Sequence, residues 1–248
     1  VKRALVEARG VAVVCAAVQK YPQNESLVKE GASLLYFAAA NDQRGKSQCV
    51  SHGAPAILAA ALAAFGGSEC LAEHAIGAVR NITAGETDAC VPRKRACVRA
   101  GLLPAVLQAM RVHRHEEDIQ EICLSALVNL ASDEAHQAVE KMSGGLAALL
   151  VSVVAAIRAF ASSEGMVFAF GLSAISMYTI RPDKEVRREL ARTAMRVGAV
   201  DVLALALAPS KRVIPDPDQI AGVLLDLLLS DLEGADTRAA FRKAGVLV

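Results

Sequence analysis

The sequence predicts an all-α fold in which helices pack on helices in repeated units, an alpha-solenoid. Of the 248 residues, 54% are hydrophobic, but only 4% are aromatic and none is Trp. Such a chain, rich in Ala and Leu, favours helices packed on helices. A second observation is that single glycines recur ahead of apolar segments, and each apolar segment is followed by a polar break and another helix. Recurrence of one order of segments at a fixed period is typical of a repeat protein.

The glycines mark the period of the repeat, at intervals of 43 to 53 residues. An apolar helix is expected after each glycine, and Pro55 and Pro104 fall in its first turn, where a missing N–H costs no intrahelical bond. A short helix is expected before most of the glycines, because an apolar residue stands four positions earlier. The marking glycines are Gly10, Gly53, Gly101, Gly145, Gly198 and Gly245.

A longer helix is expected to close each unit, starting at acidic and cap-forming residues. The clearest unit is Gly101–Asp133, in which Asn129 stands 28 residues after the glycine. Asn81 stands at the same separation from Gly53. The fourth unit carries an insertion of four residues before its last helix. The equivalents in the other units are Ala38, Met177 and Asp226.

The short helix closed by glycine and the ending S-A-L-V-N-L-A at Ser125–Ala131 resemble the armadillo repeat. The resemblance covers nearly the whole chain and implies a right-handed superhelix of about five three-helix repeats. A two-helix HEAT-type unit is the structural alternative. We expect a single array over residues 1–248, part of a longer chain because both ends fall within a repeat. The expected repeats are 1–45, 46–92, 93–133, 134–182, 183–232 and a partial repeat at 233–248.

In the armadillo family the third helices line a concave groove, and their asparagines bind the main chain of an extended partner. The matching positions here are Asn81 and Asn129, with Asp226 as a variant. An amide both donates and accepts hydrogen bonds, so it can pair with a peptide bond whatever the side chain. The alternative is that these asparagines only bridge or cap neighbouring helices.

Residues four and eight positions before the asparagines share their helix face. The row four positions earlier is mostly small: Leu34, Gly77, Ser125, Ser173 and Gly222. The row eight positions earlier is mostly acidic: Glu30, Glu73, Glu121, Ala169 and Asp218. These rows favour a basic or a helical partner segment, unless the acids serve only the helix dipole. The expected groove comprises Glu30, Glu73, Gly77, Arg80, Asn81, Glu121, Ser125, Asn129, Ser173 and Asp226.

The sequence shows no motif for catalysis, for cofactor or metal binding, or for nucleic-acid binding. The hydrolase, phosphate-loop and dinucleotide motifs are absent, so no catalytic residue and no cofactor are expected. His113 and His115 lack Cys or acidic partners at zinc-site spacing, so no metal site is expected. The 27 Lys+Arg against 26 Asp+Glu argue against nucleic acid. The basic run Arg93–Arg95 is expected to be a solvated face, and the uncharged runs are shorter than the ~18–20 residues of a membrane span.

The sequence therefore predicts a non-catalytic scaffold or adaptor that binds a protein or peptide along the groove. The alternatives are a docking or autoinhibitory domain of a larger enzyme and a part of a cytoskeletal or ciliary assembly. A nuclear-transport adaptor is less favoured, since importin alpha lines this groove with Trp. Six irregularly spaced cysteines among aliphatic residues predict reduced thiols and a cytoplasmic location, with nucleus or cytoskeleton as alternatives. The partner's identity and the oligomeric state are not specified.

Overall fold

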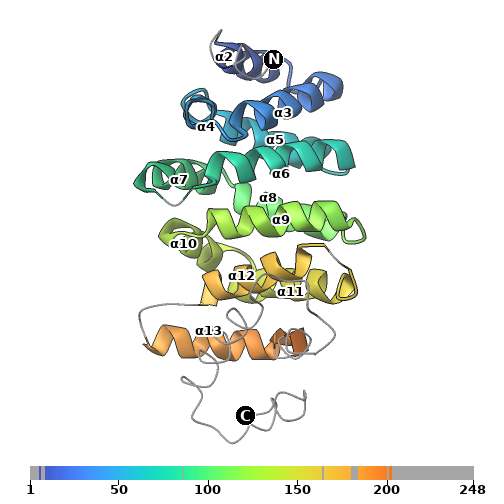
Figure 1. Ribbon diagram of the computed structural model, residues 1–248, viewed down its shortest axis with the longest axis vertical. Helices are drawn as coiled ribbons and strands as arrows, with labels where there is room; N and C mark the ends of the chain where they lie inside the picture. Colours follow the sequence, from blue (N-terminus) through green and yellow to red (C-terminus); the bar gives the residue numbers. More distant parts are fainter. Residues whose placement is uncertain are drawn as a thin grey trace, which may run out of the picture. The chain divides into compact units, whose positions relative to one another are not determined.

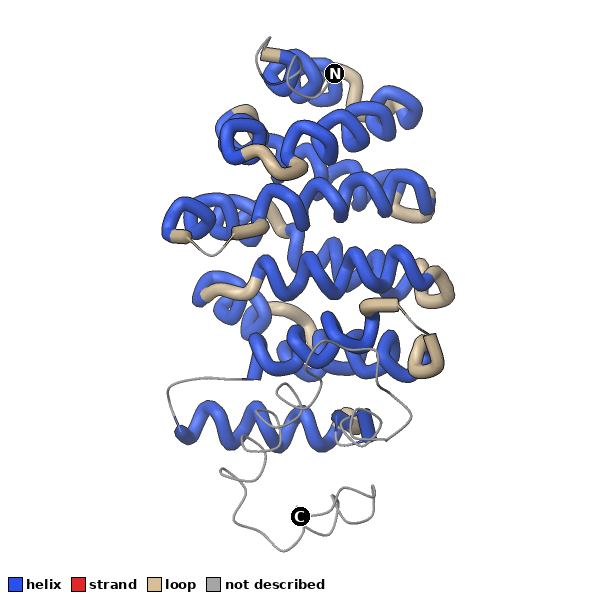
Figure 2. Tube along the Cα trace, viewed as in Figure 1, coloured by secondary structure: helices blue, strands red, loops and turns tan. Residues whose placement is uncertain are grey.

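The prediction of an all-α fold is confirmed. The computed structural model describes residue 6 and residues 9–85, 87–163, 165–179, 184–199 and 201–202. Within these ranges the regular secondary structure is helical, without a strand (Figures 1 and 2). The chain divides into two compact units, residues 1–138 and 139–248.

The first unit is built from helices that recur in the order short, medium and long. Two such triplets are complete, α4–α5–α6 and α7–α8–α9, while α2 and α3 are the medium and long helices of the repeat before them. The elements are α2 (Gly10–Lys20), α3 (Glu25–Ala39), α4 (Gln43–Ser51), α5 (Ala54–Phe65), α6 (Glu69–Thr83), the 3-10 helix η1 (Asp88–Cys90), α7 (Val91–Arg99), α8 (Leu102–Val112) and α9 (Glu117–Leu130), followed by α10 (Asp133–Lys141), which runs into the second unit.

Equivalent helices of the first unit lie side by side. The long helices α3, α6 and α9 form one layer, and the medium helices α2, α5 and α8 form another (Figure 1). The core between the layers is aliphatic, and Leu58, Leu71, Ile76, Leu103 and Leu107 in it are at most 1% exposed. Each such side chain stabilises the fold by about 1.5–3 kcal/mol relative to an exposed one. This core holds the long helices in place.

Left-handed backbone turns join the short helices to the medium ones. Gly53, at φ 77°, directly precedes α5, and Gly101, at φ 82°, directly precedes α8. Glycine is favoured here because a side chain is strained at these angles. In the first repeat the left-handed residue is Arg9, at φ 57°, and Gly10 already lies inside α2. The glycine count therefore misplaces the first repeat by one residue.

The second unit contains the end of α10 and then α11 (Gly145–Ala159), α12 (Val167–Thr179) and α13 (Lys184–Arg196). Helix α11 has 15 residues, against 12 in α5 and 11 in α8, so residues of the predicted insertion lengthen the medium helix. A Cβ on Gly171 would lie 2.4 Å from Ile157 Cγ1, so glycine lets α12 approach α11 closely. The chain order of one short helix followed by two longer ones therefore continues through residue 179, although α11, with 15 residues, is longer than α12, with 13.

The described helices are short. The longest, α3, α6 and α11, have 15 residues each. None of the described helices alone is long and apolar enough to cross a bilayer. By length and composition, the pairs α4 with α5 and α10 with α11 reach that threshold only when the two helices of a bent pair are counted together.

Candidate protein-binding surface

Asn81 and Asn129 bridge neighbouring long helices. The amide Nδ2 of Asn81, on α6, donates a hydrogen bond of 3.2 Å to the Tyr36 carbonyl of α3. The Nδ2 of Asn129, on α9, donates one of 3.1 Å to the Arg80 carbonyl of α6. Both side chains are half-buried. The bridging role that was the alternative for these residues is thus present, at the same place in two successive repeats.

The acceptor carbonyls lie where the long helices end. The Ala40 N–H, which would reach Tyr36 in a continuing helix, bonds instead to the Phe37 carbonyl at 3.3 Å. Asn81 therefore supplies a donor that the helix end does not. The Arg80 carbonyl also accepts from the Ala84 N–H, at 3.0 Å. Each bridge uses one N–H of its amide, and the second N–H and the oxygen are not needed for it.

Helix boundaries give the first repeat a different equivalent of the asparagines. Counted from the residues that precede α3, α6 and α9, which are Asn24, Ser68 and Glu116, Phe37 stands where Asn81 and Asn129 stand. Phe37 is 51% exposed, whereas Ala38 is fully buried. The assignment of Ala38 was wrong, because Arg9 rather than Gly10 occupies the left-handed turn.

The same shift changes two further positions of the first repeat. The residue eight before Phe37 is Lys29 rather than Glu30, and the residue four before it is Ser33 rather than Leu34. Lys29 lies 3.9 Å from Glu25 in an ion pair. Glu30 is exposed, but it stands one position further round α3 than the row of Glu73 and Glu121. The small row is more uniform than expected: Ser33, Gly77, Ser125 and Ser173.

Met177 of the second unit resembles Asn81 in the burial of the two residues that follow it. It is 51% exposed and is followed by buried Tyr178 and Thr179, as Asn81 is followed by buried Ile82 and Thr83. Both threonines donate to the carbonyl four residues earlier, at 2.7 Å for Thr83 and 2.8 Å for Thr179. Ser173, one turn before Met177, donates to the Ala169 carbonyl at 2.9 Å. Asp226 lies outside the described residues.

The space expected at Gly77 is filled by an aromatic ring. A Cβ on Gly77 would lie 2.9 Å from Cδ2 and 3.0 Å from Cε2 of Tyr36. The Tyr36 ring also makes edge contacts with the ring of Phe37, at 5.1 Å between centroids, and with that of His74, at 5.9 Å. The surface is therefore closed at Gly77, and an aromatic patch of Tyr36, Phe37 and His74 lies there. Sequence reasoning missed this patch, although the adjacent Tyr36-Phe37 pair was a visible signal in so aromatic-poor a chain.

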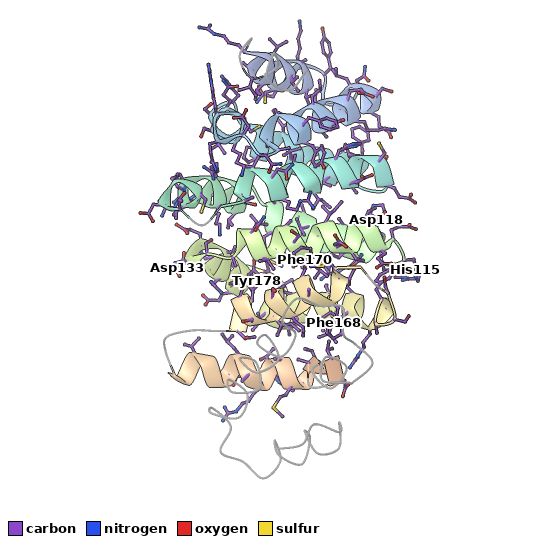
Figure 3. All side chains as sticks on the ribbon, in the orientation of Figure 1. His115, Asp118, Asp133, Phe168, Phe170 and Tyr178 are labelled. Carbon is purple, nitrogen blue, oxygen red and sulfur yellow. The ribbon has the colours of Figure 1, made fainter. Side chains whose placement is uncertain are left out.

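An acidic band crosses the N-terminal halves of the three long helices. Glu73 and Glu121 are each the fifth residue of their helix. The helix dipole acts mainly within the first turn, so it accounts for these two less well than for Glu69 or Glu117. Asp118 and His115 mark this end of α9 in Figure 3, and Asp133 lies beyond its other end. The band comprises Glu25, Glu30, Glu69, Glu73, Glu117, Asp118 and Glu121.

Arg93 does not belong to a solvated basic face. It is 5% exposed, and its guanidinium donates to the carbonyls of Ile82 at 2.8 Å, Ala89 at 2.8 Å and Ala84 at 3.3 Å. Buried Lys46 donates to the same Ala84 carbonyl at 3.0 Å. The prediction was wrong for Arg93, because the C-terminal carbonyls of α6 need donors and this side chain supplies them.

Another residue of the basic run, Arg95, is paired with Glu134. A hydrogen bond from its own backbone N–H, helped by Arg95, lowers the pKa of the Glu134 carboxyl below its ordinary value. Arg95 and Arg93 are therefore both occupied within the chain, whereas Arg99 is exposed. Two of the three residues in the basic run therefore form contacts within the fold and are not free to bind a partner.

Two hollows of the first unit lie on the opposite layer, among the medium helices. One of about 480 Å³ lies between α5 and α8, and one of about 310 Å³ lies between α2 and α5. Helix α5 carries no charged side chain and exposes alanines such as Ala60 and Ala63. We call the exposed side of the medium helices α2, α5 and α8, which includes Ala60 and Ala63, the outer face. It is a second surface that a partner could contact, and sequence reasoning did not single it out.

The described residues offer little reactive chemistry. No group of three or more His, Cys, Asp or Glu side chains among them is placed to hold a metal ion. Burial raises the pKa of the Cys15 thiol to about 11 and that of Cys49 and Cys97 to about 12, and it raises that of Cys123 further. Thiols of this kind are inert. Cys70 is exposed, with Sγ 3.6 Å from His74 Nδ1.

No protein-family model matches the chain, and no curated protein matches it. Among solved structures, one from a study of the phosphorylation-switched interaction between cadherin and beta-catenin has a TM-score of 0.78 at 19% identity, covering 99% of this chain and 45% of that one. An engineered protein has a TM-score of 0.72 at 22% identity, covering 99% of this chain and 53% of that one. A second engineered protein has a TM-score of 0.67 at 21% identity, covering 95% and 85%.

These comparisons bear on the fold. This chain spans about half the length of the first two structures, 45% and 53%. Identities of 19% to 22% carry the fold alone. The likeness over nearly the full chain, together with the triplets of short, medium and long helices, shows an armadillo-like helical-repeat fold, an alpha-solenoid.

Proposed function

We propose that this chain is a non-catalytic protein-interaction scaffold that binds a partner segment on the long helices of its first unit. The observation that carries the proposal is the row of Phe37, Asn81 and Asn129 beside the acidic band, on three helices that lie side by side. We call this row and the band together the long-helix surface. The likeness to a structure solved for an interaction of beta-catenin with cadherin supports a protein partner.

The surface is preorganised for binding. The bridges from Asn81 and Asn129 connect α3 to α6 and α6 to α9, and the Arg93 guanidinium secures the end of α6. Helices held this way lose little conformational entropy when a partner docks, which favours affinity. A scaffold of stacked repeats supplies such a rigid, extended surface.

The chemistry of the surface favours a basic partner segment. Glu30, Glu73 and Asp118 are exposed, and Glu121 is half-buried. Such a band attracts Lys and Arg, speeds association and disfavours acidic competitors. Since Tyr36 closes the space at Gly77, the partner lies on the surface and contacts it through side chains, which a helical segment does as readily as an extended one. Ser173 is the corresponding position of the second unit, and Asp226 remains a sequence prediction.

Site-specific photo-crosslinking tests the proposal. A photoreactive amino acid is placed at Asn129, or at Ala60 on the outer face, and the complete chain is exposed to lysate before mass spectrometry. We expect one protein to be enriched from the Asn129 position and not from the Ala60 position. A partner crosslinked only from Ala60 would place binding on the outer face and overturn the proposal.

A docking or autoinhibitory domain of a larger enzyme would use the same surface, with the partner segment supplied by its own polypeptide. A role in a cytoskeletal or ciliary assembly, or less favourably in nuclear transport, would differ in the partner that the crosslink captures. We also propose a cytoplasmic location, which imaging of the tagged full-length protein tests directly.

A further inference from the structure

We propose that Phe37, Tyr36 and Glu73 form a subsite for one arginine side chain of the partner segment. This inference rests on the proposed function and specifies its partner. The subsite lies where the C-terminal half of α3 meets α6.

Phe37 is the first element of the subsite. Half of this side chain, 51%, is exposed, at the position where the next two repeats place asparagine. An exposed large apolar side chain on a rigid surface is typical of a contact residue rather than of a core residue. Its neighbour Ala38 already fills the core position, so Phe37 is not needed there.

Tyr36 fixes the arrangement of the rings. It covers Gly77, whose missing Cβ leaves room for the phenol ring, and it contacts the rings of both Phe37 and His74 at interplanar angles of 66° and 67°. The two aromatic residues of α3 are thereby held against α6. A partner side chain meets an aromatic surface that is already ordered.

Two exposed carboxylates lie on the helices that carry the aromatic patch. Glu73 stands four residues before Gly77 on α6, and therefore about 6 Å along the helix axis, at about 1.5 Å per residue, from the residue that Tyr36 covers. Glu30 stands two turns before Phe37 on nearly the same face of α3. Both are exposed, and neither forms an ion pair within the described part of the chain. Lys29, the chain neighbour of Glu30, is paired with Glu25.

Aromatic faces beside free carboxylates are the surroundings that a guanidinium prefers. Arginine stacks on aromatic rings through its planar group and binds carboxylates with two parallel N–H groups, whereas lysine offers a more strongly hydrated point charge. No Lys or Arg of the described residues stacks on the ring of Tyr36 or Phe37. Among the described residues the cation–π contact is that of Lys20 with Tyr21, at 5.3 Å. The subsite thus fits an arginine supplied from outside.

Amide NMR of the complete chain tests this, with the capped tripeptide N-acetyl-Gly-Arg-Gly-amide as probe at low salt. Matched probes carry Lys or norleucine in place of Arg. We expect the Arg peptide to shift the amides around Phe37 and Glu73, with an affinity at least threefold above that of the Lys peptide. Phe37→Leu and Glu73→Gln should each weaken it roughly threefold to fivefold, while Asp118→Asn should not. Circular dichroism confirms that each variant is folded.

Three results would overturn the subsite: no shift at 20 mM peptide, equal affinity for the norleucine peptide, or no loss in Phe37→Leu. Equal binding of norleucine would mean a purely apolar contact. Failure of the subsite is distinguishable from failure of the proposed function. In the first case a partner is still crosslinked from Asn129 while the Arg peptide fails, and in the second it is crosslinked only from Ala60.

Discussion

Replacing the two asparagines separately distinguishes a structural from a ligand-binding role. In Asn81→Ala the Tyr36 carbonyl loses its 3.2 Å donor, and the Ala40 N–H is already bonded to Phe37. In Asn129→Ala the Arg80 carbonyl keeps the Ala84 N–H at 3.0 Å. A part-buried hydrogen bond contributes about 0.5–1.5 kcal/mol, and an acceptor left without a partner costs about 1–3 kcal/mol. We expect a loss of about 1–2 kcal/mol for Asn81→Ala and about 0.5–1 kcal/mol for Asn129→Ala.

Urea denaturation of the complete chain, followed by circular dichroism, measures both losses. Asn81→Asp is the matched control, because it keeps the shape of the side chain but turns an oxygen toward the Tyr36 carbonyl. It should destabilise the chain at least as much as Asn81→Ala. If both alanine variants unfold at the wild-type urea concentration, the bridges contribute nothing. A simultaneous loss of partner binding would then make these amides ligand groups instead.

Three further expectations concern the rest of the first unit. Arg93→Met removes three hydrogen bonds to backbone carbonyls, one buried and two part-buried, and should cost about 2–4 kcal/mol by urea denaturation, whereas the exposed Arg99→Met should change stability by less than about 0.5 kcal/mol. Arg9→Gly should stabilise the chain by about 1 kcal/mol because it relieves φ 57°, while Gly101→Val should destabilise it by at least that much; equal stabilities would contradict the strain argument. Of the six thiols, Cys70 alone should react rapidly with a thiol reagent at pH 7.5, and fast reaction of Cys49 would show that its burial is wrong.

Sequence reasoning recovers those parts of the fold that local patterns determine. Gly53 and Gly101 mark left-handed turns, and apolar periodicity marks the helices that follow them. Both depend on interactions within a few residues of the chain, so they can be read without a structure. The position of Asn81 and Asn129 near the ends of the long helices was recovered for the same reason.

The register of the first repeat could not be read from the glycines. Arg9 adopts a backbone angle that is normally found at glycine. The equivalent of Asn81 was counted from the neighbouring Gly10 instead, so it was placed one residue too late. The error moved Phe37 out of the predicted row and Glu30 into it. A count from the helix start at Asn24 would have placed Phe37 correctly.

Contacts between repeats also could not be predicted from the sequence. The covering of Gly77 by Tyr36, the bridges of Asn81 and Asn129, and the burial of Arg93 all join residues on different helices. Spacing along the chain says which residues share a helix face but not what the next helix places against it. The candidate site was therefore recovered as a set of positions, and its contacts were not.

The affinity of the complete chain for the crosslinked partner tests the central claim most directly. Surface plasmon resonance would compare wild type with Glu73→Lys/Glu121→Lys, and with Ala60→Lys, which places a lysine on the outer face, as a control. Reversing two charges of the band should weaken binding by about tenfold or more, mainly through slower association, and Ala60→Lys should leave it unchanged. Undiminished affinity of a folded Glu73→Lys/Glu121→Lys chain, or a loss confined to Ala60→Lys, would contradict binding on the long-helix surface.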